Sequence, residues 1–441
     1  MKPLNSAPLD LPEDNQPEKS QTPEFKENPA GLIIEDIRNH FFEPAENEED
    51  EMEKSDIRHI EQSGTYEKAE QVARRPVLAI GDLDADFSSL VKIMDKAGYI
   101  AFENNPGEQQ KDIRLREKGL AGTVVQTGDF FDRGKDLLTM LEFISTLREN
   151  GVDFRMTAGN HDLMALYAFS CPSVVNADPD FYRLVKDTIR ICHHEPGIDP
   201  QQIANAVIKN DLIHKRDGNS HIHHSDVLNF INWYFEGGRN FFKEMQAPEH
   251  HHFDKHNPTL REHLEKAHQL MFGDSIYART LQKLSVFEPI DDVLYLHAGI
   301  DDYWADMIEE KGIDRLNAEF REDLAENNLK EYVFGIKRHA FWRRHSALTP
   351  NSAQVIKNLG FKAVVRGHDI TASGQPESHT EYGVKVVNID IGIKTGKLGG
   401  ALITADNKIE GFTAKKHLLL GNLPPLKRIV PLKYEPKAKS A

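Results

Sequence analysis

The chain has 441 residues, of which 28% are charged and 39% are hydrophobic, and its formal net charge is −16 at pH 7. This length exceeds one ordinary hydrophobic core, so we expect one large domain with appendages or two domains. The acidic balance argues against a nucleic acid partner bound through a broad basic face.

Cysteine content and hydropathy set further bounds. Only Cys171 and Cys192 occur, without a CxxC pair, so neither a disulfide framework nor a cysteine zinc site is indicated. Neither is followed six positions later by Arg, which excludes the H-C-x5-R loop of cysteine phosphatases. No apolar stretch is long enough to span a bilayer, and the first twenty residues lack the apolar core of a secretory signal. We therefore expect a soluble protein of a reducing compartment, the cytoplasm.

The first predicted unit is residues 1–70, which are rich in Pro, Glu, Asn and Ser, with seven acidic residues between positions 43 and 53. This composition is typical of a solvated, mostly disordered arm. Within it, GLIIEDIRNHFF at 31–42 has apolar residues at roughly helical spacing, which predicts a short helix packed on the core.

Residues 71–170 and 285–415 form the predicted catalytic domain. Short apolar runs rich in β-branched residues each end in Gly and a polar cluster, which indicates buried strands with chemical groups at their ends. These runs are VLAIGD, TVVQTGD, FRMTAGNHD, VLYLHAG, AVVRGHD and VVNIDIG. Helical stretches such as FSSLVKIMDKAG and LLTMLEFISTLREN separate some of them, so the pattern predicts an α/β layer fold.

Two further units differ in texture. Residues 171–284 are helical, polar and His-rich, with ten of the 21 histidines at positions 214–268, and we interpret them as an insertion because strand-like runs resume at VLYLHAG. Residues 416–441 are basic and contain Pro. We expect this tail to wrap the surface or to be disordered.

The strand-end clusters carry the residue types that a pair of divalent cations needs, namely carboxylate, amide and imidazole groups. Two cations about 3.5 to 4 Å apart can bind both the attacking and the leaving oxygens of a phosphoryl transfer. The clusters supply Asp82, Asp84, Asp129, Asp132, Asn160, His161, His297 and His368.

In this order the clusters resemble the calcineurin-like metallophosphoesterases, and within them the phosphoprotein phosphatase (PPP) group. That family is marked by GD-x-H-G, GD-x-x-DRG, GNH[DE], H-[AG]-G and a later [GA]-H. Here GDFFDRG and GNHD match fully, while LYLHAGI and VVRGHDI match well. The resemblance implies a sandwich of two mixed β-sheets flanked by helices, with 171–284 as a large helical insertion.

The resemblance also implies the metal ligands. It makes Asp129 the ligand that bridges two divalent cations, with Asp82 on the first cation. Asn160, His297 and His368 complete the second. In the family, a metal-bridging hydroxide attacks phosphorus in line.

Catalytic roles follow from the same resemblance. His161, paired with Asp132, is the candidate proton donor to the leaving oxygen, and Arg133 is a phosphate clamp. Bacterial relatives have a second clamp in W-x-R, which FWRRHS offers as Arg344, with Arg343 as its competitor.

The first motif departs from the family, because Asp84 and Ala85 stand where His and Gly are expected. With Asp84 as a metal ligand, three carboxylates face two cations, and the site has one positive charge fewer than with a neutral imidazole. We therefore expect Mn²⁺ or Mg²⁺ over Zn²⁺ or iron.

Other functions remain open from the sequence. The D-x-D of haloacid-dehalogenase-type phosphatases fits poorly, because Asp86 stands where Thr or Val is expected and the later motifs are left unexplained. A dinucleoside polyphosphate hydrolase would use the same motifs. A degenerate phosphatase that only binds phosphorylated partners is a third reading, which Asp84 allows.

The sequence therefore predicts a metal-dependent phosphomonoesterase, a protein phosphatase that acts on a phosphorylated protein or peptide. The inserted helices and variant first motif are loosely similar to bacterial Wip-type effector phosphatases, which would place the protein in a host cell. No recognisable motif encodes the choice among phosphoserine, phosphothreonine and phosphotyrosine. The same holds for the physiological substrate, the oligomeric state and the role of the acidic arm.

Overall fold

The computed structural model describes residues 68–72, 74–104, 111–194, 197–214, 224–247, 258–393, 397, 399–404, 406–413, 417–422 and 426–430. The predicted helix at 31–42 and nearly all of the acidic arm lie outside the described residues, as do parts of the His-rich segment and the end of the tail.

Two mixed β-sheets form the centre of the fold. The six-stranded sheet has the spatial order β14 (His417–Asn422), β13 (Lys408–Thr413), β12 (Gly399–Ile403), β2 (Val77–Ile80), β5 (Thr123–Gln126) and β6 (Asp153–Met156). In this sheet β2, β5 and β6 are parallel, and β12, β13 and β14 continue it antiparallel.

The second sheet has five strands and is also mixed. Its spatial order is β10 (Glu377–Glu381), β11 (Val384–Asn388), β9 (Ala363–Arg366), β8 (Val293–Leu296) and β7 (Phe287–Ile290). The central strands β11, β9 and β8 are parallel, and both edge strands are antiparallel to their neighbours.

The two sheets pack face to face through the alternation of their side chains. In β2, Val77 and Ala79 belong to one buried cluster with residues of both sheets, such as Val125 and Tyr295. Leu78 and Ile80 point the other way, into the larger core beneath the helices. Because both faces of β2 are buried, its sequence is a continuous apolar run. The predicted sandwich of two mixed sheets flanked by helices is confirmed.

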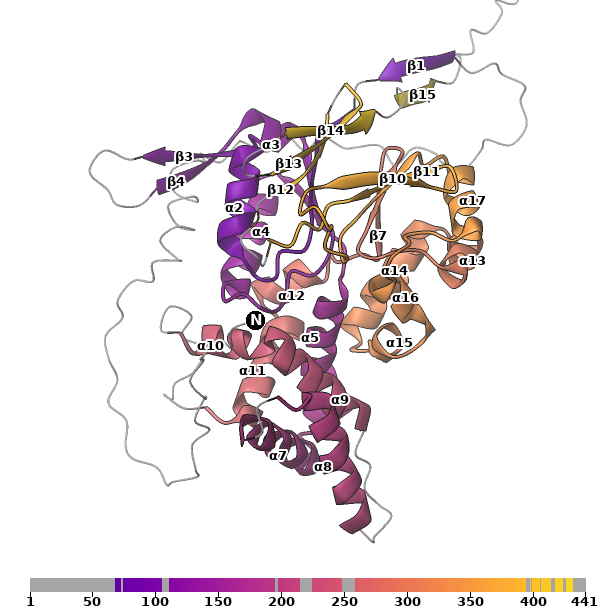
Figure 1. Cartoon of the computed structure of the whole chain (residues 1–441). Coiled ribbons are helices and arrows are strands. Elements are labelled where there is room, and N and C mark those ends of the chain that lie inside the picture. The colour runs from indigo at the N-terminus through magenta and orange to yellow at the C-terminus, as the bar shows by residue number, and fades with distance from the viewer. Residues whose placement is uncertain are drawn as a thin grey trace, which may run out of the picture.

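Helices cover the outer faces of the sandwich, with α2 and α4 beside the six-stranded sheet and α13 and α17 near the five-stranded one (Figure 1). The helices of these two halves are α2 (Phe87–Lys96), α3 (Glu117–Ala121), α4 (Leu137–Glu149), α13 (Asp302–Lys311), α14 (Ile313–Ala325), α15 (Lys330–Val333), η2 (Ile336–Arg338), α16 (His339–Trp342) and α17 (Pro350–Asn358).

A helical lobe lies between β6 and β7 and extends away from the sandwich (Figure 1). Its apolar faces follow the helical repeat, as in α7, where Phe181, Leu184, Val185 and Ile189 are buried. The lobe contains α5 (Asn160–Ser170), α6 (Pro172–Val175), α7 (Pro179–His194), α8 (Pro200–His214), α9 (His224–Trp233), η1 (Tyr234–Gly238), α10 (Arg239–Gln246), α11 (Leu260–Phe272) and α12 (Ile276–Leu281).

The segment after Lys415 contains strands that the sequence analysis did not predict. β14 extends the six-stranded sheet, and β15 (Leu426–Val430) pairs with β1 (Lys68–Val72). A hairpin of β3 (Ile100–Asn104) and β4 (Lys111–Leu115) was likewise not predicted.

Among the described residues, no helix combines the length and the apolar character needed to cross a membrane.

Candidate metal centre

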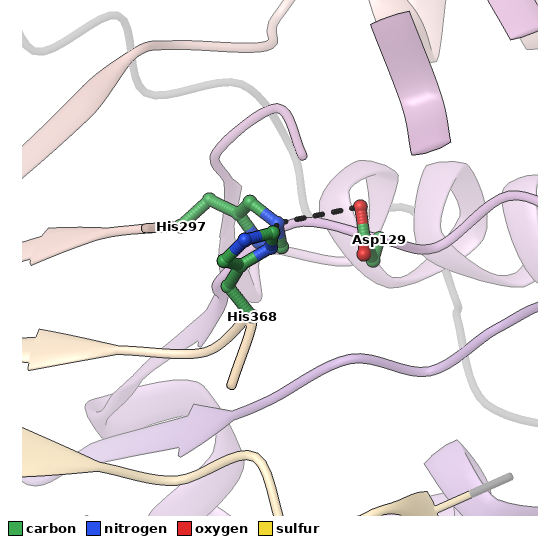
Figure 2. A group of neighbouring side chains, drawn as sticks. All are labelled: Asp129, His297 and His368. Carbon is green, nitrogen blue, oxygen red and sulfur yellow. Dashed lines mark hydrogen bonds and ion pairs between the residues drawn. The ribbon is translucent and has the colours of Figure 1, made fainter. Parts of the chain in front are cut away.

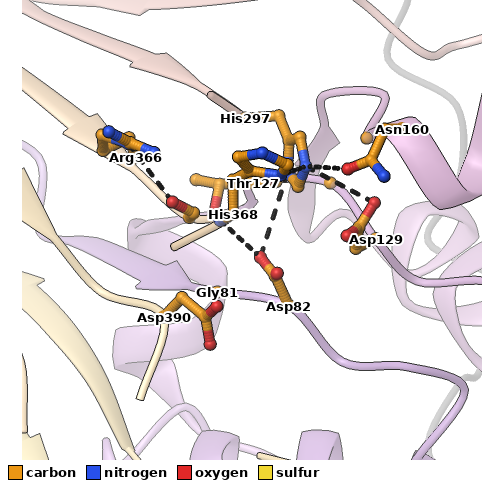
Figure 3. Close-up of polar contacts among 12 residues, drawn as sticks. Gly81, Asp82, Thr127, Asp129, Asn160, His297, Arg366, His368 and Asp390 are labelled. Carbon is orange, nitrogen blue, oxygen red and sulfur yellow. Dashed lines mark hydrogen bonds and ion pairs between the residues drawn. The ribbon is translucent and has the colours of Figure 1, made fainter. Parts of the chain in front are cut away.

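Five predicted ligands follow strands of the two sheets. Asp82, Asp129 and Asn160 come after β2, β5 and β6 of the six-stranded sheet, while His297 and His368 come after β8 and β9 of the other. Because the strands within each set are parallel, their carboxyl ends lie at one edge, where an α/β sheet presents its functional groups. The fold therefore brings ligands from both sheets to one place (Figure 3).

His297 is at the centre of this group. Its Nε2 lies 3.0 Å from Asn160 Oδ1, 3.0 Å from His368 Nδ1 and 3.5 Å from Asp129 Oδ1. Its Nδ1 donates to the carbonyl oxygen of Thr127 at 2.8 Å, which fixes the tautomer and leaves the Nε2 lone pair facing the group. Burial lowers the pKa of His297, so the ring is neutral, as a metal ligand must be.

The donor atoms fit a divalent cation. Asp129, His297 and His368 are all buried, and one potential ligand atom from each lies within 4.8 Å of the others (Figure 2). Burial and the neighbouring His297 lower the pKa of His368 to about 3, and among the described residues its buried Nε2 has no hydrogen-bond partner. A cation stabilises a buried carboxylate and neutral imidazole rings that converge in this way.

The two carboxylates of the centre differ. Burial by itself raises the pKa of Asp129, but His297, His161 and His368 outweigh burial and lower it to about 2. Burial and the carboxylates of Asp390, Asp129 and Asp84 instead raise the pKa of Asp82 well above its ordinary value. Asp82 Oδ1 accepts the backbone N–H of His368 at 3.0 Å. This crowding of negative charge is the environment that a bound cation relieves.

A second cluster adjoins the first. His161 Nδ1 lies 2.8 Å from Asp132 Oδ2, and the backbone N–H of His161 donates to Asp129 Oδ1 at 3.0 Å. Burial lowers the pKa of His161, but Asp129 and Asp132 outweigh it and raise the pKa to about 9. Its Nε2 faces Arg133 Nη2 at 3.0 Å. A positioned acid and a guanidinium thus stand beside the ligand group.

Asp84 lies next to this second cluster. It is 3% exposed, and its carboxylate forms an ion pair with Arg133. It has a left-handed backbone (φ 50°), as do Asp129 (φ 55°) and Asp132 (φ 72°). Such backbone conformations in non-glycine residues cluster at functional sites. Asp84 is not one of the three residues whose ligand atoms converge.

Arg344 lies at the rim of the site. Its side chain is 59% exposed, and its Nη1 lies 3.3 Å from Oδ1 of Asp369, the residue after His368. Its competitor Arg343 donates to the backbone oxygen of Ser346 at 2.8 Å.

The sequence analysis missed Asp162, the last residue of GNHD. Its buried carboxylate accepts four backbone N–H groups, from Gly159 at 2.7 Å and from Asp129, Phe130 and Phe131 at 2.9 Å each. It therefore holds the loop that carries Asp129. The signal was the Asp at the N-terminus of α5, a position that favours acidic side chains.

The sequence analysis also missed contacts from the inserted lobe. Asn240 Nδ2 donates to the backbone oxygen of Arg133 at 2.7 Å, and Glu236 Oε2 lies 3.5 Å from Arg133 Nη2. A Cβ on Gly237, which has φ 142°, would lie 2.3 Å from the Arg133 nitrogen. No local sequence pattern could reveal these contacts, because more than 100 residues separate the partners.

Residues 75–286 match the calcineurin-like phosphoesterase family. The matched range contains Asp82, Asp129 and Asn160, and it ends before His297 and His368. A search of curated proteins gave no match.

Three solved structures show similarity to the chain. A cold-active protein-tyrosine phosphatase of a psychrophile Shewanella species is 18% identical to this chain. The alignment covers 80% of this chain and 82% of the phosphatase, with a TM-score of 0.46. A protein serine/threonine phosphatase from Saccharomyces cerevisiae is 14% identical, with coverages of 78% and 82% and a TM-score of 0.39. The phosphatase domain of the Legionella effector WipB is 14% identical, with coverages of 71% and 97% and a TM-score of 0.31. At these values they decide neither the reaction nor the substrate of this chain.

Proposed function

We propose that the chain, whose residues 75–286 match the calcineurin-like phosphoesterase family, is a metal-dependent phosphomonoesterase that acts on phosphorylated proteins. One observation carries the proposal: Asp129, His297 and His368 converge from two sheets, within contact of Asn160 and beside the His161–Asp132 pair.

The ligand group would hold two divalent cations. Asp129 would lie between them, with Asp82 on one side and Asn160, His297 and His368 on the other. When bound, such cations supply an activated water and neutralise phosphate oxygens. The protein contributes a rigid, buried ligand set whose histidines are already neutral.

The second cluster would handle the proton and the phosphate group. Asp132 holds His161 through Nδ1, and with substrate bound Nε2 would carry the proton to the leaving oxygen. Arg133 lies on the Nε2 side of that ring, where its guanidinium can bind phosphate oxygens in a fork. Arg344, from the rim, would supply a second cationic contact.

Asp84 would set the charge of the centre while holding Arg133. Its carboxylate raises the pKa of Asp82, so its negative charge acts on the metal site even while it pairs with Arg133. A more negative centre acidifies bound water less and favours hard, oxygen-preferring cations. We therefore propose Mn²⁺, with Mg²⁺ second. Zinc or iron held tightly in the purified protein would contradict this choice.

The test is phosphate release from phosphotyrosine and phosphothreonine peptides by metal-stripped protein titrated with Mn²⁺. We expect turnover to appear with Mn²⁺ and to fall about a hundredfold or more in Asp129→Asn. Asp314→Asn, an exposed change on α14 that adjoins none of the ligands, is the matched control and should retain full activity. The ratio between the peptides assigns the substrate class.

Two outcomes would replace the proposal. Phosphopeptide binding without phosphate release under any divalent cation would make the protein a phosphoprotein-binding scaffold. Hydrolysis of diadenosine tetraphosphate in preference to both peptides would make it a dinucleoside polyphosphate hydrolase.

A further inference from the structure

A cavity of about 460 Å³ lies against Arg133, between the loop that follows β5 and helix α10. Arg133, Lys135 and Asp136 line it from the loop, and Asn240, Lys243 and Glu244 line it from α10. Its volume lies within the range of sites that bind small groups.

The two walls of the cavity are fastened together. Asn240 donates to the backbone oxygen of Arg133, and Glu244 accepts the N–H groups of Leu137 at 2.9 Å and Leu138 at 2.8 Å. The Glu244 side chain thus satisfies two of the free N–H groups at the N-terminus of α4. Hydrogen bonds between the loop and α10 therefore hold the two walls of the cavity in place.

The lining of the cavity holds three cationic side chains, Arg133, Lys135 and Lys243, against the two carboxyl groups of Asp136 and Glu244, so its formal charge is opposite in sign to that of the whole chain. Lys135 and Lys243 are exposed, and within the described part of the structure neither amine forms an ion pair or a hydrogen bond. The buried Glu244 carboxyl is engaged by the α4 amides, and burial raises its pKa to about 8. Against a net charge of −16, these two lysines beside Arg133 form a local cationic patch.

Arg133 connects the cavity to the reaction site. It lines the cavity, and its Nη2 reaches to 3.0 Å from His161 Nε2. An extended peptide advances about 3.3 Å per residue. A residue close in sequence to a phosphorylated residue bound at His161 would therefore reach the cavity with its side chain.

We propose that this cavity is a subsite for an anionic side chain that flanks the phosphorylated residue of the substrate, bound by Lys135 and Lys243. The ligand is a carboxylate of Asp or Glu, or a second phosphate group. This inference rests on the proposed function and specifies its substrate class.

The test compares matched phosphopeptides that carry Ala, Glu or a second phosphorylated residue on either side of the target, assayed on the full chain with Mn²⁺. We expect the wild-type protein to favour the acidic peptides by about fivefold or more in kcat/KM. Lys135→Gln with Lys243→Gln should abolish the preference, and the double change to Glu should reverse it. The preference should also decrease as salt rises from 0.05 to about 0.5 M, because exposed charges are screened.

Lys209→Glu is the matched control, since Lys209 is exposed on α8 of the same lobe and does not line the cavity. Equal kcat/KM for neutral and acidic peptides, or a preference that survives both double variants or is lost in Lys209→Glu, would overturn the subsite. Hydrolysis of p-nitrophenyl phosphate by the wild-type protein separates this outcome from a failure of the proposed function.

Discussion

Arg133 contacts groups with three different roles. Its guanidinium pairs with Asp84 and faces His161 Nε2, and its backbone oxygen accepts from Asn240. A guanidinium held on two sides keeps its fork in one orientation, which suits bidentate phosphate binding. We therefore infer that Asp84, which the sequence analysis assigned to the metal ligands, positions Arg133.

This inference predicts coupling between the two residues. Asp84→Asn and Arg133→Lys should each lower kcat/KM for a phosphopeptide by about tenfold. The double variant should lose about tenfold rather than a hundredfold, because both changes remove the same interaction. Steady-state kinetics on the three variants measure the coupling.

Metal content separates this role from ligation. Plasma mass spectrometry should find as much bound metal per chain in Asp84→Asn as in the wild-type protein. Loss of metal from Asp84→Asn, or independent effects of Asp84→Asn and Arg133→Lys on kcat/KM, would show that Asp84 is a metal ligand.

At the scale of elements, the inserted lobe is attached to the catalytic loop by α10. Glu244 binds the N-terminus of α4, and the π-helical turn η1 brings Gly237 against Arg133. A π-helical turn with a glycine at φ 142° permits this close approach of two backbones. The lobe therefore supports the phosphate-binding loop as well as lining the cavity.

The buried carboxyl of Glu244 predicts a pH dependence of stability. Burial raises its pKa in the folded protein from 4.5 to about 8. Between about pH 5 and 8 the unfolded chain has already lost this proton and the folded protein retains it, so the free energy of unfolding falls with rising pH. Glu244→Gln should remove this contribution, so that wild type loses stability relative to the variant across the window.

Urea unfolding at pH 5, 6, 7 and 8 measures the difference between the two proteins. Glu117→Gln, an exposed change on α3, is the control and should follow the wild-type curve. A difference between wild type and Glu244→Gln that stays constant over the window would show that Glu244 remains ionised in the folded protein.

At the scale of the molecule, the ligands join the two halves of the sandwich. Asp129 and Asn160 come from the six-stranded sheet, and His297 and His368 come from the five-stranded sheet. A cation at this point would cross-link parts of the chain separated by more than 130 residues. It would therefore stabilise the assembly of the two sheets.

Metal removal should accordingly lower global stability. We expect the thermal midpoint of metal-stripped protein to rise with Mn²⁺ concentration. At a hundredfold excess of Mn²⁺ over Kd, the free energy of unfolding should increase by about 2.7 kcal/mol. Differential scanning calorimetry with and without Mn²⁺ gives this shift. Asp129→Asn should show almost no Mn²⁺ dependence, and a midpoint independent of Mn²⁺ in the wild-type protein would contradict the proposed centre.

The boundaries of the insertion at 171–284, the acidic arm at 1–70 and the tail at 416–441 remain predictions, as does a location in a host cell. Within the described residues, helices do fill the span from α6 to α12, and β14 and β15 lie within the tail.

The family resemblance predicted the sandwich, and the sequence by itself predicted its buried strands and the candidate ligand residues. Each depends on a local pattern: an apolar β-branched run predicts a buried strand, and Gly with Asp, Asn or His marks its end. The carboxyl ends of parallel strands gather at one edge of a sheet, and the family resemblance assigned Asp129, His297 and His368, which follow strands of two sheets, to one centre.

Only the tertiary structure decided how the remaining groups are used. Four contacts join residues that local sequence patterns do not relate. They are the ion pair of Asp84 with Arg133, the backbone amides that bind Asp162, the attachment of α10 to the Arg133 loop, and the pairing of β15 with β1. Such contacts depend on where distant segments pack, and packing between distant segments is a property of the whole fold.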